Sequence, residues 1–493
     1  MRHLRQVILI LADTQRRDML GAFGAHRIHT PNLDRLASTG VLFNRAYTAQ
    51  ASCGPARSAI LTGLYPHANG CWANNLPLAH GKTVGQRLQA TGLSCGYIGT
   101  WHLDGTDYFG SGHPALGWEP DAWYDLRCYL EELSPADRVR SRLVGTTFAG
   151  AGVSASFTYA HRCSDRALAF VEQHRRMDFL LVVSYDESHH PFLAPQCWVQ
   201  AQAALAFPDS PNQADGLADK PEHIRRWAQT GNRQGKDTLT AFLGCHAFLD
   251  HEVGRLFTGI DRYAPDALVL YAADHGDGLG AHGIWGTGPA LYEEIVGVPL
   301  IVRWPGHLPA GARWVQPVSL VDITPTILEA FGVPLAAGGQ GESLLGMFGS
   351  DQRPAGRSVF IEFNRDDVDD DGTGGFLPIR GVTDGHFKLV VNLLTTDELY
   401  DLDRDPYELT NLIDRKEFAS RRNALHHQLL EWMNHTRDPF RGHVWEARPW
   451  RLDATPATWD YTGMTRQRQA EPDEAPLLDY VTGLEMLTPV RRK

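Results

Sequence analysis

Long apolar runs that end abruptly in polar residues recur through the first two-thirds of the chain. Residues 7–12 lead into Asp13, residues 179–184 lead into a polar segment, and residues 266–273 lead into Asp274. Runs that are apolar on both faces are typical of parallel strands covered by helices. The pattern therefore predicts a large, mostly parallel sheet.

Helix-spaced apolar positions lie between and after these runs. They recur over 165–175, 238–257 and 321–331. Because strands alternate with helices, we expect an α/β fold in which helices sandwich a mixed, mostly parallel sheet. Residues 105–155 have little periodicity and predict a long insertion, and the polar residues 205–237 predict a surface excursion or lid.

The pattern changes after about residue 340, where short apolar stretches separated by turns replace the alternation. These stretches predict a small antiparallel sheet and lie at 357–362, 376–382, 387–392 and 399–402. We therefore expect a large α/β domain over 1–350, a smaller α+β domain over 351–445 and an extended C-terminal tail over 446–493. The tail is a candidate for contacts with a second copy of the chain.

Polar side chains with metal-binding and acid–base chemistry follow the predicted strands. Asp13, His102, His189, Asp274 and His275 all come shortly after a strand. Ligands bind beyond the carboxyl ends of strands in open α/β sheets, so we expect these side chains to share one edge. Carboxylates with an imidazole suit a divalent cation, although a helix-capping role for Asp13 is an alternative.

A cysteine, a proline and an arginine share the stretch 53–57, Cys-Gly-Pro-Ala-Arg. Proline favours the first helical turn, so Pro55 indicates where a helix begins. Cys53 then lies at a helix N-terminus, where free N–H groups favour negative charge, and Arg57 adds a fork suited to an oxyanion. The stretch predicts an anion site with a reactive side chain; the alternative is a structural cysteine beside a surface arginine.

Composition and charge narrow the classes of function. A hydrophobic content of 43% with 21% charged residues is typical of a soluble globular protein, and a net charge of −12 argues against a general nucleic-acid binder. The seven cysteines are scattered without a C-x-x-C pair, which favours a reducing compartment. The apolar run 7–12 is too short for an export signal or a membrane span. We therefore expect a cytoplasmic protein without a nucleic-acid or membrane partner.

Several motifs, in order along nearly the whole chain, resemble those of the sulfatase family, which has an alkaline-phosphatase-like fold. They are 10–13 at the end of the first strand, 53–57 with Leu-Thr-Gly at 61–63 and Tyr-Pro-His at 65–67, Gly-Thr-Trp-His-Leu at 99–103, His-His-Pro-Phe at 189–192, Asp-His-Gly at 274–276, Gly-Ile-Trp-Gly at 283–286, and Leu-Tyr-Asp-Leu at 399–402. The family includes phosphonate monoester and phosphodiester hydrolases.

The resemblance implies a catalytic chemistry that the bare residues do not disclose. A formylglycine-generating enzyme would convert Cys53 to formylglycine, whose hydrate is the nucleophile. Arg57 would stabilise the charge that develops during transfer. His102 would hold the hydrate or assist its collapse, and His189 would hydrogen-bond the ester or protonate the leaving oxygen.

The resemblance also implies a metal centre beside this nucleophile. Asp13, Asp274, His275 and the group derived from Cys53 would hold one divalent cation, with Ca²⁺ expected first and Mn²⁺ or Zn²⁺ as alternatives. The family usually has a second aspartate at position 14. Thr14 can offer only a neutral hydroxyl to the ion.

Two further positions depart from the family pattern. Thr100 and Thr287 stand where the family has lysines, so two cations near the anion are lost. Each charge that faces a bound anion is worth about 1 to several kcal/mol depending on burial. The loss disfavours dianionic phosphate monoesters most, and favours singly charged sulfate esters, phosphodiesters or phosphonate monoesters.

We therefore expect a sulfuric ester hydrolase acting on a small-molecule or saccharide ester. The alternatives are a phosphodiester or phosphonate monoester hydrolase with the same machinery and, from another class, a catalytically silent binding homologue. Asn75, Thr100 and Thr287 are candidates for lining the substrate site, and Glu362, Asn364 and Arg380 for reaching it from the second domain.

Two other stretches receive separate predictions. The aromatic residues of the insertion suit stacking on an aryl or sugar group, although packing is the alternative; they are Tyr108, Trp118, Trp123 and Tyr124. The acidic loop 366–372 begins like a calcium loop, but Pro378 occupies the position that needs a glutamate, so we expect a solvated or substrate-facing loop.

Overall fold

The computed structural model describes residues 4–24, 28–105, 108–143, 153–203, 210–230, 236–335, 338–348, 356–365, 375–460, 471, 474–486 and 491–492. The acidic loop 366–372 and the predicted domain boundary at 350/351 lie outside these residues.

A mixed eight-stranded sheet forms the centre of the large domain, in the order β10-β2-β9-β7-β1-β6-β4-β5. Its strands are β1 Gln6–Ala12, β2 Val41–Phe43, β4 Ser94–Gly99, β5 Trp123–Tyr124, β6 Phe179–Tyr185, β7 Leu268–Ala273, β9 Leu300–Arg303 and β10 Ala312–Trp314. All neighbours are parallel except β9, which runs antiparallel to β7 and β2. The predicted mostly parallel sheet is confirmed. A smaller sheet has the order β11-β3-β8 and consists of β3 Ala46–Tyr47, β8 Gly297–Val298 and β11 Val318–Ser319.

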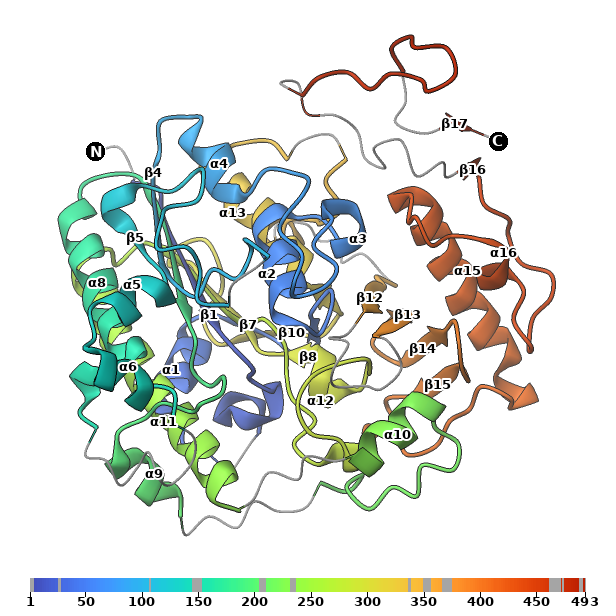
Figure 1. The fold of residues 1–493 in the computed structure, drawn as a ribbon, viewed down its shortest axis with the longest axis horizontal. Coiled ribbons are helices and arrows are strands. Elements are labelled where there is room, and N and C mark those ends of the chain that lie inside the picture. The colour runs from blue at the N-terminus through green and yellow to red at the C-terminus, as the bar shows by residue number, and fades with distance from the viewer. Residues whose placement is uncertain are drawn as a thin grey trace.

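Helices cover both sides of the central sheet, which explains why β1 and β6 are buried along their whole length (Figure 1). The helices of this domain are α1 Pro31–Thr39, α2 Cys53–Thr62, α3 Pro66–Asn69, α4 Val84–Gln89, α5 Leu126–Glu131, α6 Pro135–Arg140, α8 Tyr159–His174, α9 Gln196–Gln202, α10 Glu222–Thr230, α11 Lys236–Tyr263, α12 Glu293–Val296 and α13 Ile323–Phe331. In Figure 1, α8 and α11 lie on one side of the sheet and α2 and α13 on the other.

The insertion predicted over 105–155 contains more regular structure than its sequence pattern indicated. It includes β5, α5 and α6. Trp118 and Trp123 are buried, and both rings pack against Tyr97 of β4 at centroid distances of 5.1 and 5.4 Å. These tryptophans are therefore core residues, because the insertion contributes one edge of the sheet. The predicted excursion at 205–237 likewise contains α10.

The C-terminal region contains an antiparallel sheet in the order β12-β13-β14-β15, as predicted. Its elements are β12 Val359–Arg365, β13 Phe376–Thr383, β14 Phe387–Asn392, β15 Glu398–Asp401, α15 Ala419–Thr436 and α16 His443–Glu446. Helix α15 packs on β13 and β14. Beyond α16, Arg448 and Trp450 bond to Asp397, so the start of the predicted tail is fastened to this domain. The tail also contains β16 Trp459–Asp460 and β17 Arg491–Arg492. Its contact with a second copy of the chain stays a prediction.

Candidate active site

The central sheet brings the predicted site residues together at the carboxyl ends of four neighbouring strands. Ala12 of β1 pairs with Ala273 of β7 on one side and with Tyr185 of β6 on the other. Asp13 and Asp274 follow these strands directly, so adjacent parallel strands deliver two carboxylates to one edge. β6 leads to His189, and β4 leads to His102.

Helix α2 presents Cys53 to this edge. The helix begins at Cys53 and ends at Thr62, and the capping residue Gly63 has a φ of 69° and donates its N–H to the Ala59 carbonyl at 3.0 Å. Asn74 Oδ1 accepts a hydrogen bond from the Gly54 N–H at 3.0 Å and another from the Ser52 hydroxyl at 3.0 Å. The start of the helix is therefore held in place by a neighbouring turn.

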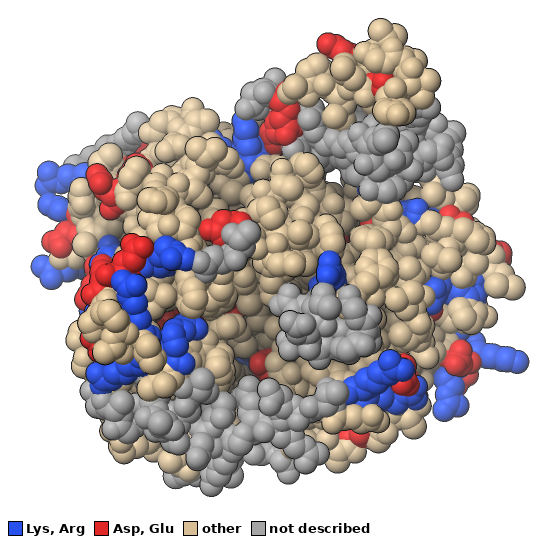
Figure 2. All heavy atoms as spheres, viewed as in Figure 1, with Lys and Arg blue, Asp and Glu red and all other residues tan. Residues whose placement is uncertain are grey.

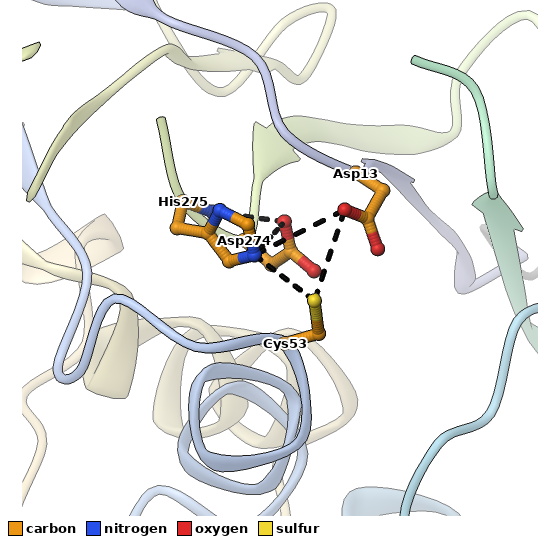
Figure 3. A group of neighbouring side chains, drawn as sticks. All are labelled: Asp13, Cys53, Asp274 and His275. Atoms are coloured by element: carbon orange, nitrogen blue, oxygen red, sulfur yellow. Dashed lines mark hydrogen bonds and ion pairs between the residues drawn. The ribbon is translucent and has the colours of Figure 1, made fainter. Parts of the chain in front are cut away.

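Asp13, Cys53, Asp274 and His275 form one buried group, which we call the site cluster (Figure 3). One potential ligand atom from each residue lies within 4.8 Å of the others. Cys53 Sγ lies 3.1 Å from His275 Nε2 and 3.9 Å from Asp13 Oδ1. His275 Nδ1 lies 2.9 Å from the Gly276 carbonyl, which only accepts, so Nδ1 carries a hydrogen and Nε2 faces the cluster. Two carboxylates and an imidazole nitrogen at these separations fit a divalent cation.

Arg57 lies beside the site cluster and is fully buried. Its Nη2 donates to Asp13 Oδ2 at 2.9 Å, and its Nε lies 3.0 Å from Asp274 Oδ2. Its Nη1 donates to the Thr100 carbonyl at 2.8 Å and to the Ser184 hydroxyl. The guanidinium thus joins the ends of β1, β7, β4 and β6 and offsets part of the carboxylate charge.

The electrostatic environment makes the Cys53 thiol a poor nucleophile. Burial, and then the charges of Asp13 and Asp274, raise the pKa of Cys53 well above its ordinary value. A thiolate is the nucleophilic form of cysteine, so a raised pKa disfavours direct attack by this thiol. Burial also raises the pKa of Asp274, and Asp13 adds to this effect. For Asp13, burial acts to raise the pKa, but His189, Arg57 and His275 outweigh it, and the pKa is lowered.

His102 and His189 flank the cluster in different environments. His102 is buried, has a φ of 52°, and leaves Nδ1 without a hydrogen-bond partner. Burial and the charge of Arg57 lower the pKa of His102 to about 4, so the imidazole is neutral at physiological pH. His189 is only partly buried and lies on the solvent side. Left-handed φ at a non-glycine residue indicates strain, which clusters at functional sites; Thr14 shares it with a φ of 53°.

The three threonines predicted to lie near the metal or the substrate each donate a hydrogen bond to an oxygen of the protein. The Thr14 hydroxyl donates to Asp13 Oδ1 at 2.6 Å. The Thr100 hydroxyl donates to Asp186 Oδ1 at 3.1 Å, and the Thr287 hydroxyl donates to the Ala51 carbonyl at 2.6 Å. Thr14 thus orients a carboxylate of the cluster, and Thr287 fastens its loop to the segment before α2. Asn75 is exposed in its turn, next to Asn74, which holds the helix start.

Sequence reasoning assigned no role to Asp186, which the structure places beside Thr100. Asp186 is buried and accepts hydrogen bonds from Thr100 and from the Tyr108 hydroxyl. Its position directly after β6 is the same signal that identified Asp13 and Asp274. Tyr108 lies in the aperiodic insertion, where no pattern marked it as part of the site.

Glu362 and Arg380 belong to a second buried group, which we call the joint cluster: His67, Glu362, Arg380 and Asp438. Glu362 accepts from His67 N at 2.7 Å and lies 2.5 Å from His67 Nδ1. Arg380 donates to both oxygens of Asp438 at 2.6 and 3.1 Å. Asn364 bonds to Glu362 at 3.2 Å. Glu362 therefore fastens the C-terminal sheet to α3, and Arg380 fastens it to the segment after α15.

Two surface observations bear on the classes of partner. Basic and acidic side chains lie interspersed on the face shown in Figure 2, instead of forming one basic patch. Among the described residues, every helix is too short or too polar to cross a bilayer.

Comparison with known proteins identifies the family. The Sulfatase family model matches residues 5–333, and the model for N-sulphoglucosamine sulphohydrolase, C-terminal, matches residues 280–435. The sulfatase YidJ of Escherichia coli (strain K12) is 38% identical over 97% of this chain and 96% of its own length. An N-acetylglucosamine-6-O-sulfatase of Bacteroides thetaiotaomicron is 24% identical over 86% of this chain and 85% of its own.

A solved structure shares the fold at low sequence identity. The phosphonate monoester hydrolase of Silicibacter pomeroyi superposes with a TM-score of 0.74 at 21% identity, over 88% of this chain and 96% of its own. The matched family model covers more than half of the chain, and it includes Cys53 and the other residues of the site cluster. The chain therefore belongs to the sulfatase family, enzymes that hydrolyse sulfuric esters.

Proposed function

We propose that this protein hydrolyses sulfate esters with a formylglycine nucleophile made from Cys53 and with one divalent metal ion. Ca²⁺ is the expected ion, and Mn²⁺ or Zn²⁺ are the alternatives. The observation that carries the proposal is the position of Cys53: it begins α2 within the site cluster, with its Sγ 3.1 Å from His275 Nε2 and with Arg57 on the same helix. Burial and the two carboxylates beside the thiol raise its pKa, which disfavours attack as a thiolate and is in line with conversion to formylglycine.

The residues of the cluster fit the metal and the converted side chain. Asp13, Asp274 and His275 Nε2 would hold the ion beside residue 53. When bound, the metal supplies Lewis-acid activation and formylglycine supplies the nucleophilic oxygen. Asp13 is pre-oriented for this role by Thr14, and Asp274 by the backbone N–H groups of Thr14 and His275 at 3.2 and 2.8 Å.

The flanking side chains would handle the protons and the charge of the transfer. Arg57 is fixed on all sides and places positive charge next to residue 53. His102, which is neutral, would hold an oxygen at residue 53 through a hydrogen bond. His189 would deliver a proton to the leaving oxygen from the solvent side.

The charge around the site favours a singly charged ester. Thr100 and Thr287 are neutral where the family pattern has lysines, and both hydroxyls are committed to protein acceptors. Asp186 adds a buried acidic residue behind Thr100. A dianionic phosphate monoester would meet less compensating charge than a sulfate ester.

A phosphodiester or phosphonate monoester hydrolase is the second candidate. Its substrates carry the same single charge, and a phosphonate monoester hydrolase shares the fold. A catalytically silent binding homologue is the third candidate, and the retention of Cys53, Arg57, His102 and His189 opposes it. A saccharide sulfate is the substrate class we favour, in line with the N-acetylglucosamine-6-O-sulfatase relative. A formylglycine-generating enzyme would be a transient partner.

The test compares three esters with one leaving group. Protein co-expressed with a formylglycine-generating enzyme is assayed with 4-nitrophenyl sulfate, 4-nitrophenyl phenylphosphonate and 4-nitrophenyl phosphate, with Cys53→Ala as the blank. We expect the highest kcat/KM for the sulfate and the lowest for the phosphate dianion. A faster phosphonate rate would establish the second candidate, and no turnover of any ester would establish the third.

A further inference from the structure

Tyr108 connects the partly exposed His189 to the buried Asp186. Its hydroxyl donates to Asp186 Oδ1 and lies 2.9 Å from His189 Nδ1. Its ring stacks on the His189 ring at a centroid distance of 5.1 Å and an interplanar angle of 28°, and meets the His102 ring edge-on at 5.1 Å. One side chain therefore contacts both histidines that flank the site cluster.

The hydrogen-bond donors and acceptors around Tyr108 fix where each hydrogen lies. A carboxylate only accepts, so the single hydroxyl hydrogen of Tyr108 points to Asp186. Burial, and then the charge of Asp186, raise the pKa of Tyr108 well above its ordinary value, so the phenol keeps that hydrogen. The Tyr108 oxygen then offers only a lone pair to His189.

His189 Nδ1 consequently carries a hydrogen. Its two neighbours are the Tyr108 oxygen at 2.9 Å and the His190 carbonyl at 2.8 Å, and both act as acceptors. In neutral histidine only one ring nitrogen is protonated, so Nε2 is the atom that gains and loses a proton. The stacked phenol ring also restricts rotation of the imidazole.

We propose that Tyr108 and Asp186 are positioning residues that make His189 Nε2 the proton donor to the leaving oxygen, and that the enzyme is built for sulfate esters of alcohols. This inference rests on the proposed function and deepens it. The nucleophilic oxygen at residue 53 would form the new bond to sulfur while the bond from sulfur to the leaving oxygen breaks. The pair of the broken bond stays on the leaving oxygen, which takes the Nε2 proton and departs as an alcohol; water later returns a proton to Nε2.

The substrate class follows from the chemistry of the leaving group. A nitrophenolate is a weak base and departs without a proton, whereas an alkoxide is a strong base and requires one. A fixed proton donor has little effect on aryl sulfates with good leaving groups and a large effect on alkyl or sugar sulfates. Asp186 and Tyr108 fix the orientation of His189, so the site is suited to esters whose leaving group is an alcohol.

The kinetic test uses two sulfate esters of similar size, 4-nitrophenyl sulfate and 2-phenylethyl sulfate. Tyr108→Phe keeps the stacked ring and removes the hydroxyl. We expect kcat/KM to fall about 100-fold for 2-phenylethyl sulfate and less than about threefold for 4-nitrophenyl sulfate, since general acid catalysis contributes about 10²–10⁴-fold. In a His189→Ala background, Tyr108→Phe should cause no further loss.

Tyr400→Phe is the matched control. Tyr400 is also buried and donates to a carboxylate, Glu398, at 2.7 Å, but it lies in β15 of the C-terminal sheet. It should leave both rates unchanged. Equal losses on both esters in Tyr108→Phe would show a packing role and overturn the proposal.

A second readout does not depend on turnover. In Cys53→Ala protein with ¹⁵N-labelled histidine, at a pH high enough to keep the imidazole neutral, the signal that disappears in His189→Gln should report a protonated Nδ1 and an unprotonated Nε2. The opposite tautomer would overturn the inference. The wild-type enzyme could hydrolyse neither ester while the Nδ1–H tautomer is observed. That result would contradict the proposed function and the proton-donor role of His189, but it would support the positioning of its ring by Tyr108.

Discussion

Two buried clusters among the described residues contain the same kinds of charged side chain. The site cluster with Arg57 and the joint cluster each combine two carboxylates, one arginine and one histidine. Each set of acidic and histidine ligands is close enough to hold a metal ion. Composition and burial alone therefore do not separate a catalytic site from a structural joint.

What differs is the origin of the side chains and their access to solvent. The site cluster collects residues from strand ends at the edge of a parallel sheet, contains a cysteine, and adjoins the partly exposed His189. The joint cluster connects α3 to β12, β13 and the segment after α15, and Trp432 packs edge-on against His67 at 5.5 Å. The two clusters are therefore distinguished by their place in the fold and by the partly exposed histidine beside the site cluster.

The largest expected difference between the clusters is in activity. Cys53→Ala should lower kcat/KM by about 10⁴-fold or more, because it removes the nucleophile. The folded protein should remain, since the side chain is small and its thiol is uncharged. Activity assays paired with thermal unfolding measure both effects. The exposed Cys197→Ala is the control and should be fully active; comparable loss there would contradict the assignment.

Breaking the joint cluster should affect stability instead. Asp438→Asn leaves Arg380 buried without its anion, which costs about 3–5 kcal/mol of unfolding free energy. Activity per folded molecule should stay within about twofold, because the hydrogen bonds of the Asp438 carboxylate in the described part of the chain join it to Arg380 and to the backbone of residue 440. Denaturant unfolding provides the measurement. Glu222→Gln, which breaks an exposed ion pair, is the control and should have no measurable effect.

Metal removal should act on one cluster only. At a Ca²⁺ concentration 100-fold above the Kd, the ion should stabilise the chelator-treated protein by about 2.7 kcal/mol. Asp274→Asn should abolish the thermal shift, and Asp438→Asn should retain it. A shift that survives in Asp274→Asn and disappears in Asp438→Asn would place the ion in the joint cluster.

The joint cluster should also give stability a distinct pH dependence. Burial acts to lower the pKa of His67, but Glu362 and Asp438 outweigh it, and the pKa is raised above 6.5. Its contribution to folding is therefore complete below about pH 6.5 and is lost as the pH rises through the folded-state pKa. His67→Gln should destabilise the protein at pH 6 and progressively less at higher pH. A pH-independent difference in unfolding free energy would contradict a charged His67.

The smallest expected effect concerns the charge of the site. Thr100→Lys should strengthen inhibition by inorganic phosphate by up to about tenfold, or about 1.4 kcal/mol, because it adds a cation near the anion. Asp186 would neutralise part of that charge, so the double variant Thr100→Lys with Asp186→Asn should show the larger gain. An unchanged inhibition constant in both variants would remove the charge argument for singly charged esters.

The sequence predicted the sheet and the site edge because both follow from backbone rules. Continuous apolar runs indicate covered parallel strands, and the polar residues after them must converge, which placed Asp13, Asp274 and His189. Side chains in irregular segments follow no such rule. In the turn after α3, Asn74 bonds to the start of α2 while its neighbour Asn75 is exposed, and the sequence pattern does not distinguish the two. Tyr108 lies beside His189, although its segment has no apolar periodicity. Arg380 pairs with Asp438, a partner 58 residues away that no local pattern marks.

The most direct test of the central claim is the chemical state of residue 53 in active enzyme. Trypsin cleavage after Arg45 and Arg57 releases the peptide 46–57, which contains Cys53. We predict that this peptide from active protein resists thiol alkylation and reacts with a hydrazide as an aldehyde. A fully active preparation whose peptide carries an intact, alkylatable thiol would contradict it.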